Sequence, residues 1–223
     1  MWQEFSAGLA DAPLWAQLAI GVVVAMFVAV LASSRVTRQR HAAAFARLAA
    51  AAGARTARTD EFTESFGTDV AGRTFDVRRE FRSTARGGSY RGPTGHLLIA
   101  STRLSGSRWE LHQVDISPGR RSAIFGAPPT VTGDDTFDAR FMVRQDGVPV
   151  RDGWLDAPTR AAVTTLFDAP GVTGPVWVQE QRLQLFVSPW LDASHATLGE
   201  WLRRQADLAG ALERTAGWRG PAA

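Results

Sequence analysis

The chain has 223 residues, which is enough for a membrane segment and one domain with a sizeable hydrophobic core. It contains no cysteine, which excludes disulfides, thiolate metal sites and a cysteine nucleophile. All 25 basic residues are arginine, but the net charge is only +3 because acidic residues alternate with them. The composition therefore does not indicate a nucleic-acid partner, which would require a dense basic stripe.

The absence of lysine and asparagine, together with abundant alanine, arginine and glycine, is typical of a GC-rich bacterial genome. The longest apolar segment covers residues 14–32 and contains no charged side chain. As a helix it would be about 28 Å long, close to the hydrocarbon thickness of a bilayer. We therefore predict one transmembrane helix over residues 14–32, preceded by a short extracytoplasmic segment at residues 1–13.

The residues that flank this helix predict its orientation. Arg35, Arg38 and Arg40 follow it, whereas residues 1–13 contain acidic residues and no arginine. The positive-inside rule then places the C-terminal part of the chain in the cytoplasm, with the helix in the plasma membrane, and Trp15 stands where an interfacial aromatic residue is expected. The competing interpretation is a cleaved signal peptide, which normally has a basic start and a shorter apolar run.

Small residues recur along one face of the predicted transmembrane helix. Gly21, Ala25 and Ala29 are four residues apart, which would let two copies of the helix pack closely as a homodimer. The alternative is that this spacing only reflects the abundance of alanine in the chain.

The next segment, residues 33–53, is rich in helix-forming residues and has no proline or glycine before Gly53. We predict that the transmembrane helix continues as a helical stalk and ends at Gly53. The arginines of this segment would either bind anionic lipid head groups or only fix the orientation of the chain.

Residues 54–217 are expected to form one cytoplasmic domain, followed by a tail at residues 218–223. Residues 54–66 read as a polar, irregular linker. Alternating apolar and polar residues then predict strands at 74–82, 96–102, 109–116, 122–125, 137–144, 176–179 and 183–187. The strands at 96–102 and 109–116 would pair as a hairpin, and so would those at 176–179 and 183–187. The clearest of these strands is the one at residues 137–144, where one face would carry Phe137, Ala139, Phe141 and Val143.

Two helices complete the predicted domain. Asp156 is the expected N-cap of the first helix, with Pro158 in its first turn. The second helix covers residues 193–215 and carries an apolar stripe at helical spacing. These elements predict an α+β fold in which a mostly antiparallel sheet is covered by the C-terminal helix. The segments before residue 54 would serve as a tether and contribute nothing to the core.

One part of the chain resembles a known family. Val131 to Phe141 ends in the sequence FDARF, and Leu155 and Pro158 then precede a short predicted helix. These motifs resemble an uncharacterised family of actinobacterial single-pass membrane proteins, in which an FD-x-x-F-x-V strand precedes a leucine-x-x-proline helix. The resemblance covers roughly residues 45–215. It implies a cytoplasmic α+β domain of unknown function, and it transfers no catalytic residue.

The densest acidic group consists of Asp134, Asp135 and Asp138. Such a cluster could bind a hard cation, or it could do acid–base chemistry with a histidine. However, the sequence TGDDT is typical of a turn, where aspartate bonds to its own backbone. We favour the turn.

Histidines give no clear metal site. His96 and His112 would face each other across the predicted hairpin, and His41 and His195 lie elsewhere in the sequence. A zinc site needs three or four converging ligands, usually including a close pair on one element, and no such pair occurs. We therefore expect no metal, no cofactor and no catalytic residue.

Three functional hypotheses follow. The first is a non-enzymatic, membrane-tethered module that binds another protein or the membrane surface. The second is a membrane-tethered enzyme with a carboxylate site near Asp134 and Asp138. The third, disfavoured by the charge pattern, is a membrane-tethered nucleic-acid binder.

Overall fold

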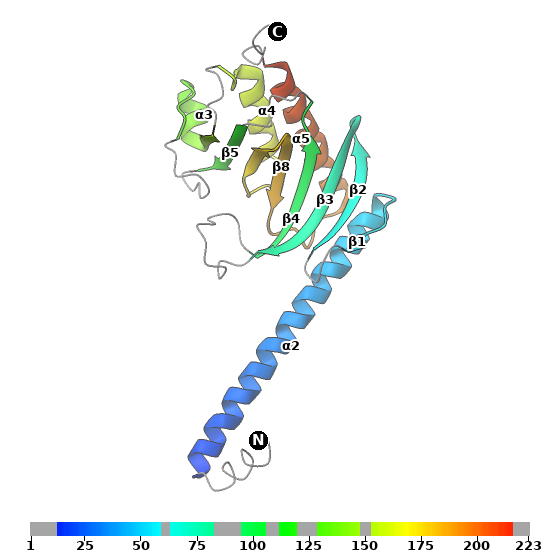
Figure 1. Ribbon diagram of the computed structural model, residues 1–223, viewed down its shortest axis with the longest axis vertical. Helices are drawn as coiled ribbons and strands as arrows, with labels where there is room; N and C mark the ends of the chain where they lie inside the picture. The colour runs from blue at the N-terminus through cyan, green and yellow to red at the C-terminus, as the bar shows by residue number, and fades with distance from the viewer. Residues whose placement is uncertain are drawn as a thin grey trace. The chain divides into compact units, whose positions relative to one another are not determined.

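The computed structural model describes residues 13–58, 63–82, 95–105, 112–119, 129–147 and 153–215 (Figure 1). The chain divides into two compact units, residues 1–43 and residues 44–223. Helix α2 (Leu14–Ala51) forms most of the first unit, and its last two turns belong to the second. The rest of the second unit is a sheet with helices, so the predicted α+β fold is confirmed.

Helix α2 runs without interruption through the predicted transmembrane segment and most of the predicted stalk. It is long and apolar enough to span a membrane, and its large apolar side chains from Leu14 to Leu31 are exposed. The helix ends as predicted: Gly53 has a φ of +70°, and the N–H of Ala54 donates to the carbonyl of Ala49 (2.9 Å). This bond satisfies a carbonyl that the helix end would otherwise leave open.

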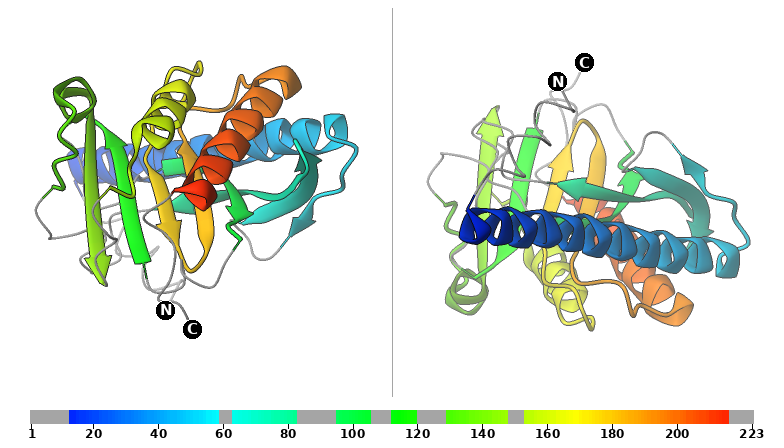
Figure 2. Two further views of the ribbon diagram at one scale, coloured as in Figure 1. Left: turned by 90° about the horizontal axis from the view of Figure 1, so that it is seen from above. Right: turned by 90° about the horizontal axis from the view of Figure 1, so that it is seen from below.

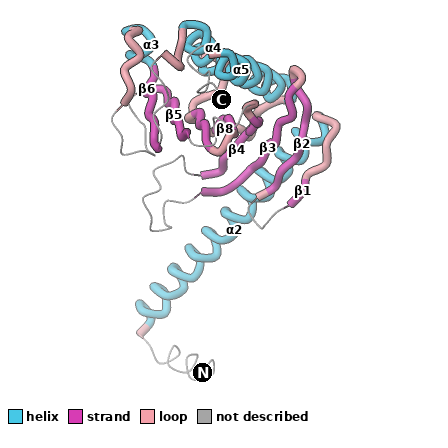
Figure 3. The backbone as a smooth tube through the Cα atoms, turned by 45° about the horizontal axis from the view of Figure 1, so that its top comes forward, coloured by secondary structure: helices cyan, strands magenta, loops and turns pink. Residues whose placement is uncertain are grey.

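The domain is built on an eight-stranded sheet in which all neighbouring strands are antiparallel. Across the sheet the strands are β1 (Ala57–Arg58), β2 (Glu64–Val70), β3 (Arg73–Arg82), β4 (Gly95–Arg103), β8 (Arg182–Val187), β7 (Val176–Gln179), β5 (His112–Pro118) and β6 (Phe141–Gly147). Helices α4 (Ala157–Phe167) and α5 (His195–Arg214) lie side by side on one face (Figure 2). The short helix α3 (Asp135–Arg140) leads directly into β6 (Figure 3).

Alternate residues of the strands point toward α4 and α5 and form a continuous core with them. Phe75 and Val77 of β3 and Leu185 of β8 are fully buried in the same cluster as Leu198 and Leu202 of α5. The predicted cover of the sheet by the apolar stripe of the last helix is therefore confirmed. The hairpin predicted for the last two strands is also present as β7 and β8.

The last two turns of α2 contribute to this core, contrary to the expectation that residues before 54 add nothing to it. Phe45 and Leu48 are buried in the main core cluster. The ring of Phe45 lies 5.1 Å from that of Phe66 on β2 and 6.1 Å from that of Trp190. The weak apolar stripe at the end of the helix thus packs against the domain, because apolar side chains of β2 and of the segment after β8 meet it there.

The predicted strand at residues 137–144 is wrong in its first half. Asp134 caps a short helix of six residues, α3, so Phe137 is helical and the strand begins only at Phe141. The apolar spacing of Phe137 and Phe141 also fits a helix, and their rings lie 4.8 Å apart. Both are buried, but Ala139 is exposed.

The predicted hairpin between residues 96–102 and 109–116 does not form. Strand β4 pairs with β3 and β8, and strand β5 pairs with β6 and β7. The C-terminal hairpin β7–β8 is inserted between them, a long-range pairing that local pattern cannot show. The expected linker at residues 54–66 includes β1 and the start of β2. The strand expected at residues 122–125 lies outside the described residues.

Candidate functional site

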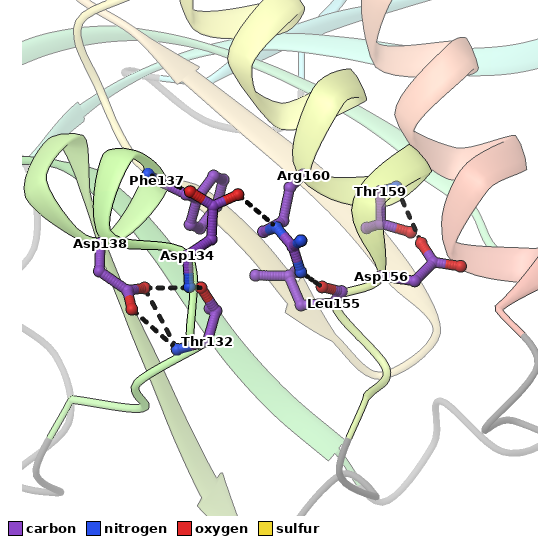
Figure 4. A network of polar contacts seen from close by, with 8 residues as sticks. All are labelled: Thr132, Asp134, Phe137, Asp138, Leu155, Asp156, Thr159 and Arg160. Carbon is purple, nitrogen blue, oxygen red and sulfur yellow. Dashed lines mark hydrogen bonds and ion pairs between the residues drawn. The ribbon is translucent and has the colours of Figure 1, made fainter.

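The acidic cluster that the sequence singled out lies on the loop before α3 and within α3 itself (Figure 4). The Asp138 carboxylate accepts hydrogen bonds from the N–H of Thr132 (3.0 Å) and from its hydroxyl (2.8 Å). These bonds join the start of the loop, at Thr132, to Asp138 within α3. The turn interpretation of this stretch agrees with the geometry, since the carboxylate bonds to nearby backbone.

The carboxylate of Asp134 bonds to the backbone of α3 and to the side chain of Arg160. It accepts a hydrogen bond from the N–H of Phe137 (3.0 Å), which caps α3, and another from Nε of Arg160 (3.0 Å). The bond from Phe137 lowers the pKa of Asp134 below its ordinary value; burial opposes this shift, and Arg160 adds to the lowering. Asp134 is therefore a carboxylate at neutral pH, unsuited to act as a general acid.

Arg160 connects the starts of two helices. Besides its ion pair with Asp134, it donates from Nη1 to the carbonyl of Leu155 (2.7 Å), just before α4. The N-cap of α4 is Asp156, as predicted, and its carboxylate accepts from the N–H of Thr159 (2.9 Å). Figure 4 shows this chain of contacts from Thr132 to Thr159. Sequence analysis missed Arg160, because nothing local indicates that an arginine of α4 meets a loop 26 positions earlier.

An open groove of about 380 Å³ lies between α3 and α4. Phe137 and two alanines of α4 form its apolar part, and Arg140 and Arg160 contribute guanidinium groups. Arg140 forms an ion pair with Asp168 (2.7 Å) in which both side chains are about half exposed. The described residues that line the groove include no histidine. The arrangement offers a mixed polar and apolar surface, and the carboxylate of Asp134, which lines the groove, is already held by the N–H of Phe137 and by Arg160.

The two histidines that were expected to face each other are far apart in the sheet. His96 is on β4 and His112 is on β5, and strands β8 and β7 separate them. The predicted His96–His112 pairing is therefore wrong. Within the residues that the structure describes, no group of three or more histidine, aspartate or glutamate side chains is placed to hold a metal ion.

Two buried polar groups were missed by the sequence analysis. Asp115 and Ser117 of β5 are buried, and the Ser117 hydroxyl donates to the Asp115 carboxylate (2.7 Å). Gln205, which interrupts the apolar stripe of α5, is completely buried, and its Nε2 donates to the carbonyls of Ala100 (3.0 Å) and Leu183 (2.9 Å). A polar residue within an apolar pattern was the available signal. The Ser117 hydroxyl and the Nε2 group of Gln205 have hydrogen-bond acceptors, whereas the buried Oε1 atom of Gln205 has no hydrogen-bond partner among the described residues.

The predicted membrane-flanking residues lie on helix α2. Trp15, Arg35, Arg38 and Arg40 are exposed, as is the face with Gly21, Ala25 and Ala29. Exposure leaves these residues accessible to lipid or to a second helix. The roles assigned to them from the sequence stay predictions.

Comparisons with known proteins concern the fold. No protein-family model and no curated protein matches the chain. Among solved structures, the chain is similar to the crystal structure of the mycobacterial trehalose monomycolate transport factor A, TtfA. The two chains share 10% sequence identity with a TM-score of 0.52, and the match covers 74% of this chain and 92% of that one. At this identity the likeness shows only that the two proteins share a fold. The shared fold covers 74% of this chain.

Proposed function

We propose that this chain is a single-pass membrane protein whose α+β domain is a non-enzymatic module that binds another protein of the same membrane. The observation that carries the proposal is the fold shared with a protein that is called a transport factor, combined with a helix able to span a membrane. That name describes a factor in a transport process, and by analogy we infer a binding role for this chain.

The contacts around the acidic cluster support binding over catalysis. The carboxylates of Asp134 and Asp156 each cap a helix, and that of Asp138 closes a loop. An acid or base needs an oxygen free to meet a substrate, with a pKa shifted toward the working pH. The pKa of Asp134 is shifted the other way. The three carboxylates therefore have a structural role, because each one stabilises a helix start or a loop.

The proposed location is the plasma membrane, with the domain in the cytoplasm. The support is the position of Arg35, Arg38 and Arg40 directly after the apolar segment, where the positive-inside rule expects the cytoplasmic side. In this orientation the domain reaches the cytoplasmic surfaces of neighbouring membrane proteins.

Proximity labelling in the native host tests the proposal. A biotin-transferring enzyme is fused after Ala223, and the matched control carries the same enzyme directly after Gly53, so that it keeps helix α2 and lacks the domain. We expect at least one membrane protein to be labelled only by the full-length fusion. A labelled set that is the same for both fusions would contradict a binding role for the domain.

A further inference from the structure

Three hydroxyl residues, Ser33, Ser34 and Thr37, follow the apolar segment of α2 without any break in the helix, and we call them the polar collar. The hydroxyls of Ser33 and Ser34 donate to the carbonyls of Val30 (3.0 Å) and Leu31 (2.8 Å), and the hydroxyl of Thr37 donates to the carbonyl of Ser33 (2.9 Å). Each donor therefore has its partner in the backbone of the helix. The collar does not need water to satisfy these donors, so it suits the zone where hydrocarbon gives way to head groups.

Arginines stand on this collar with no acidic residue on the same helix. Arg35, Arg38 and Arg40 are exposed, and the whole of α2 from Leu14 to Ala51 contains neither aspartate nor glutamate. Helices that carry arginines at a water-exposed surface commonly pair them with glutamate three or four residues away. On α2 that kind of pairing cannot occur, because the helix has no carboxylate side chain.

The geometry of a helix brings these guanidinium groups close to the membrane. Arg35 lies about 4.5 Å along the axis beyond Ala32, and Arg40 lies about 12 Å beyond it, whereas the head-group layer is about 5–7 Å thick. Helical side chains lean toward the N-terminus, which here is the direction of the apolar segment. Long arginine side chains can therefore extend back into the head-group layer from all three positions.

We propose that residues 33–40 form a binding site for the phosphate groups of anionic phospholipids. A guanidinium binds phosphate oxygens with two parallel N–H groups, which gives arginine a stronger hold on a phosphate than charge alone. Arg35 and Arg38 are three residues apart and can share one lipid, while Arg40 projects from another side of the helix. This inference rests on the membrane anchor of the proposed function and adds to it the class of lipid that surrounds the anchor.

The test uses the full-length protein, purified and reconstituted into bilayer discs of equal amounts of phosphatidylcholine and phosphatidylglycerol. Native mass spectrometry then counts the lipids of each kind that stay bound. The test variant is R35Q/R38Q/R40Q. The matched control is R182Q/R203Q/R214Q, which removes the same charge from exposed arginines of the domain. Carbonate extraction from vesicles of phosphatidylcholine alone reports separately whether each protein is inserted, and a thermal melt reports whether the domain is folded.

We expect bound phosphatidylglycerol to exceed phosphatidylcholine by at least about fivefold for the natural protein, because one basic residue near an anionic surface contributes about that factor. The control variant should keep this preference, and R35Q/R38Q/R40Q should lose it while it remains inserted and folded. No preference in the natural protein, or an equal preference in both variants, would overturn the lipid site and leave the partner-binding proposal standing. A protein that carbonate extracts from the vesicles would overturn the anchor and the lipid site together.

Discussion

The aromatic rings of Phe45, near the end of helix α2, and Phe66, on strand β2, lie 5.1 Å apart in the core of the domain. Both side chains are almost completely buried. The domain core therefore begins before the first strand of the sheet, and the last two turns of α2 are part of it. A fragment that is meant to fold on its own should therefore begin before Phe45.

The first prediction is that the domain needs these two turns. Phe45→Ala should lower the free energy of unfolding by about 3–5 kcal/mol, since it removes a large buried ring. Arg47→Ala, at an exposed position of the same turn, should change it by about 0.5 kcal/mol or less. A fragment of residues 40–217 should unfold cooperatively on heating, whereas a fragment of residues 54–217 should aggregate. Equal melting of the two fragments would show that the helix end is dispensable.

The second prediction concerns Gln205. Gln205→Leu should destabilise the domain by about 1–3 kcal/mol, because two backbone carbonyls would lose a buried donor. Arg203→Leu is the control, as it introduces the same side chain on the exposed side of the same helix and should have little effect. Denaturant titration of both variants measures the difference. A neutral Gln205→Leu would mean that these carbonyls are sufficiently satisfied by the strand ladder.

The third prediction tests the start of strand β6. Phe141→Asp should unfold the domain, since an isolated buried carboxylate costs several kcal/mol. Arg140→Gln, one residue earlier, removes a half-exposed ion pair with Asp168 and the contact of the guanidinium with the Phe141 ring (5.1 Å to the ring centroid). Because both contacts are partly exposed, this variant should cost only about 1–2 kcal/mol. Circular dichroism melts of the two variants should differ clearly. Similar melting temperatures would contradict the assignment of Phe141 to the buried face.

The fourth prediction is a dependence of stability on pH. Burial by itself raises the pKa of Glu213, but the hydrogen bonds from Arg73 and from the N–H of Ser105 outweigh burial and hold the pKa below its ordinary value. The unfolded chain then binds a proton more readily than the folded one, so this contribution is present at neutral pH and is lost as the pH falls below about 4.5.

Glu213→Gln should therefore be less stable than the natural protein at pH 7, and the difference should shrink as the pH is lowered from about 5 to about 3. Denaturant titrations at several pH values measure it. A difference in stability that stays constant with pH would show that the charge of Glu213 does not matter for folding.

The fifth prediction concerns orientation. Alkaline phosphatase, which is active only outside the cytoplasm, should be inactive when fused after Ala223, and a fluorescent protein at the same position should be bright. Replacing Arg35, Arg38 and Arg40 by glutamate should weaken this orientation in the phosphatase assay. Strong phosphatase activity of the unmodified fusion would reverse the proposed topology.

Local sequence signals were sufficient wherever neighbouring residues make the structure. The apolar run predicted helix α2, and Gly53 predicted where that helix ends. Asp156 was likewise recognisable as the N-cap of α4. The β7–β8 hairpin follows from two alternating runs joined by a tight turn. The bonding of Asp138 to its own loop was likewise predictable, because an aspartate in a short turn reaches only nearby backbone.

What the tertiary structure decided was which distant segments meet. The sequence could not show that β7 and β8 lie between β4 and β5, because the alternation of apolar and polar residues fixes the face of a strand and not its neighbour. It could not show that Arg160 holds Asp134, or that Gln205 reaches two strand carbonyls, because these bonds join residues 22 to 105 positions apart. Phe45 is the clearest case: its helical spacing was visible, but whether that face meets lipid, water or the domain depends on a sheet built from residues further along the chain.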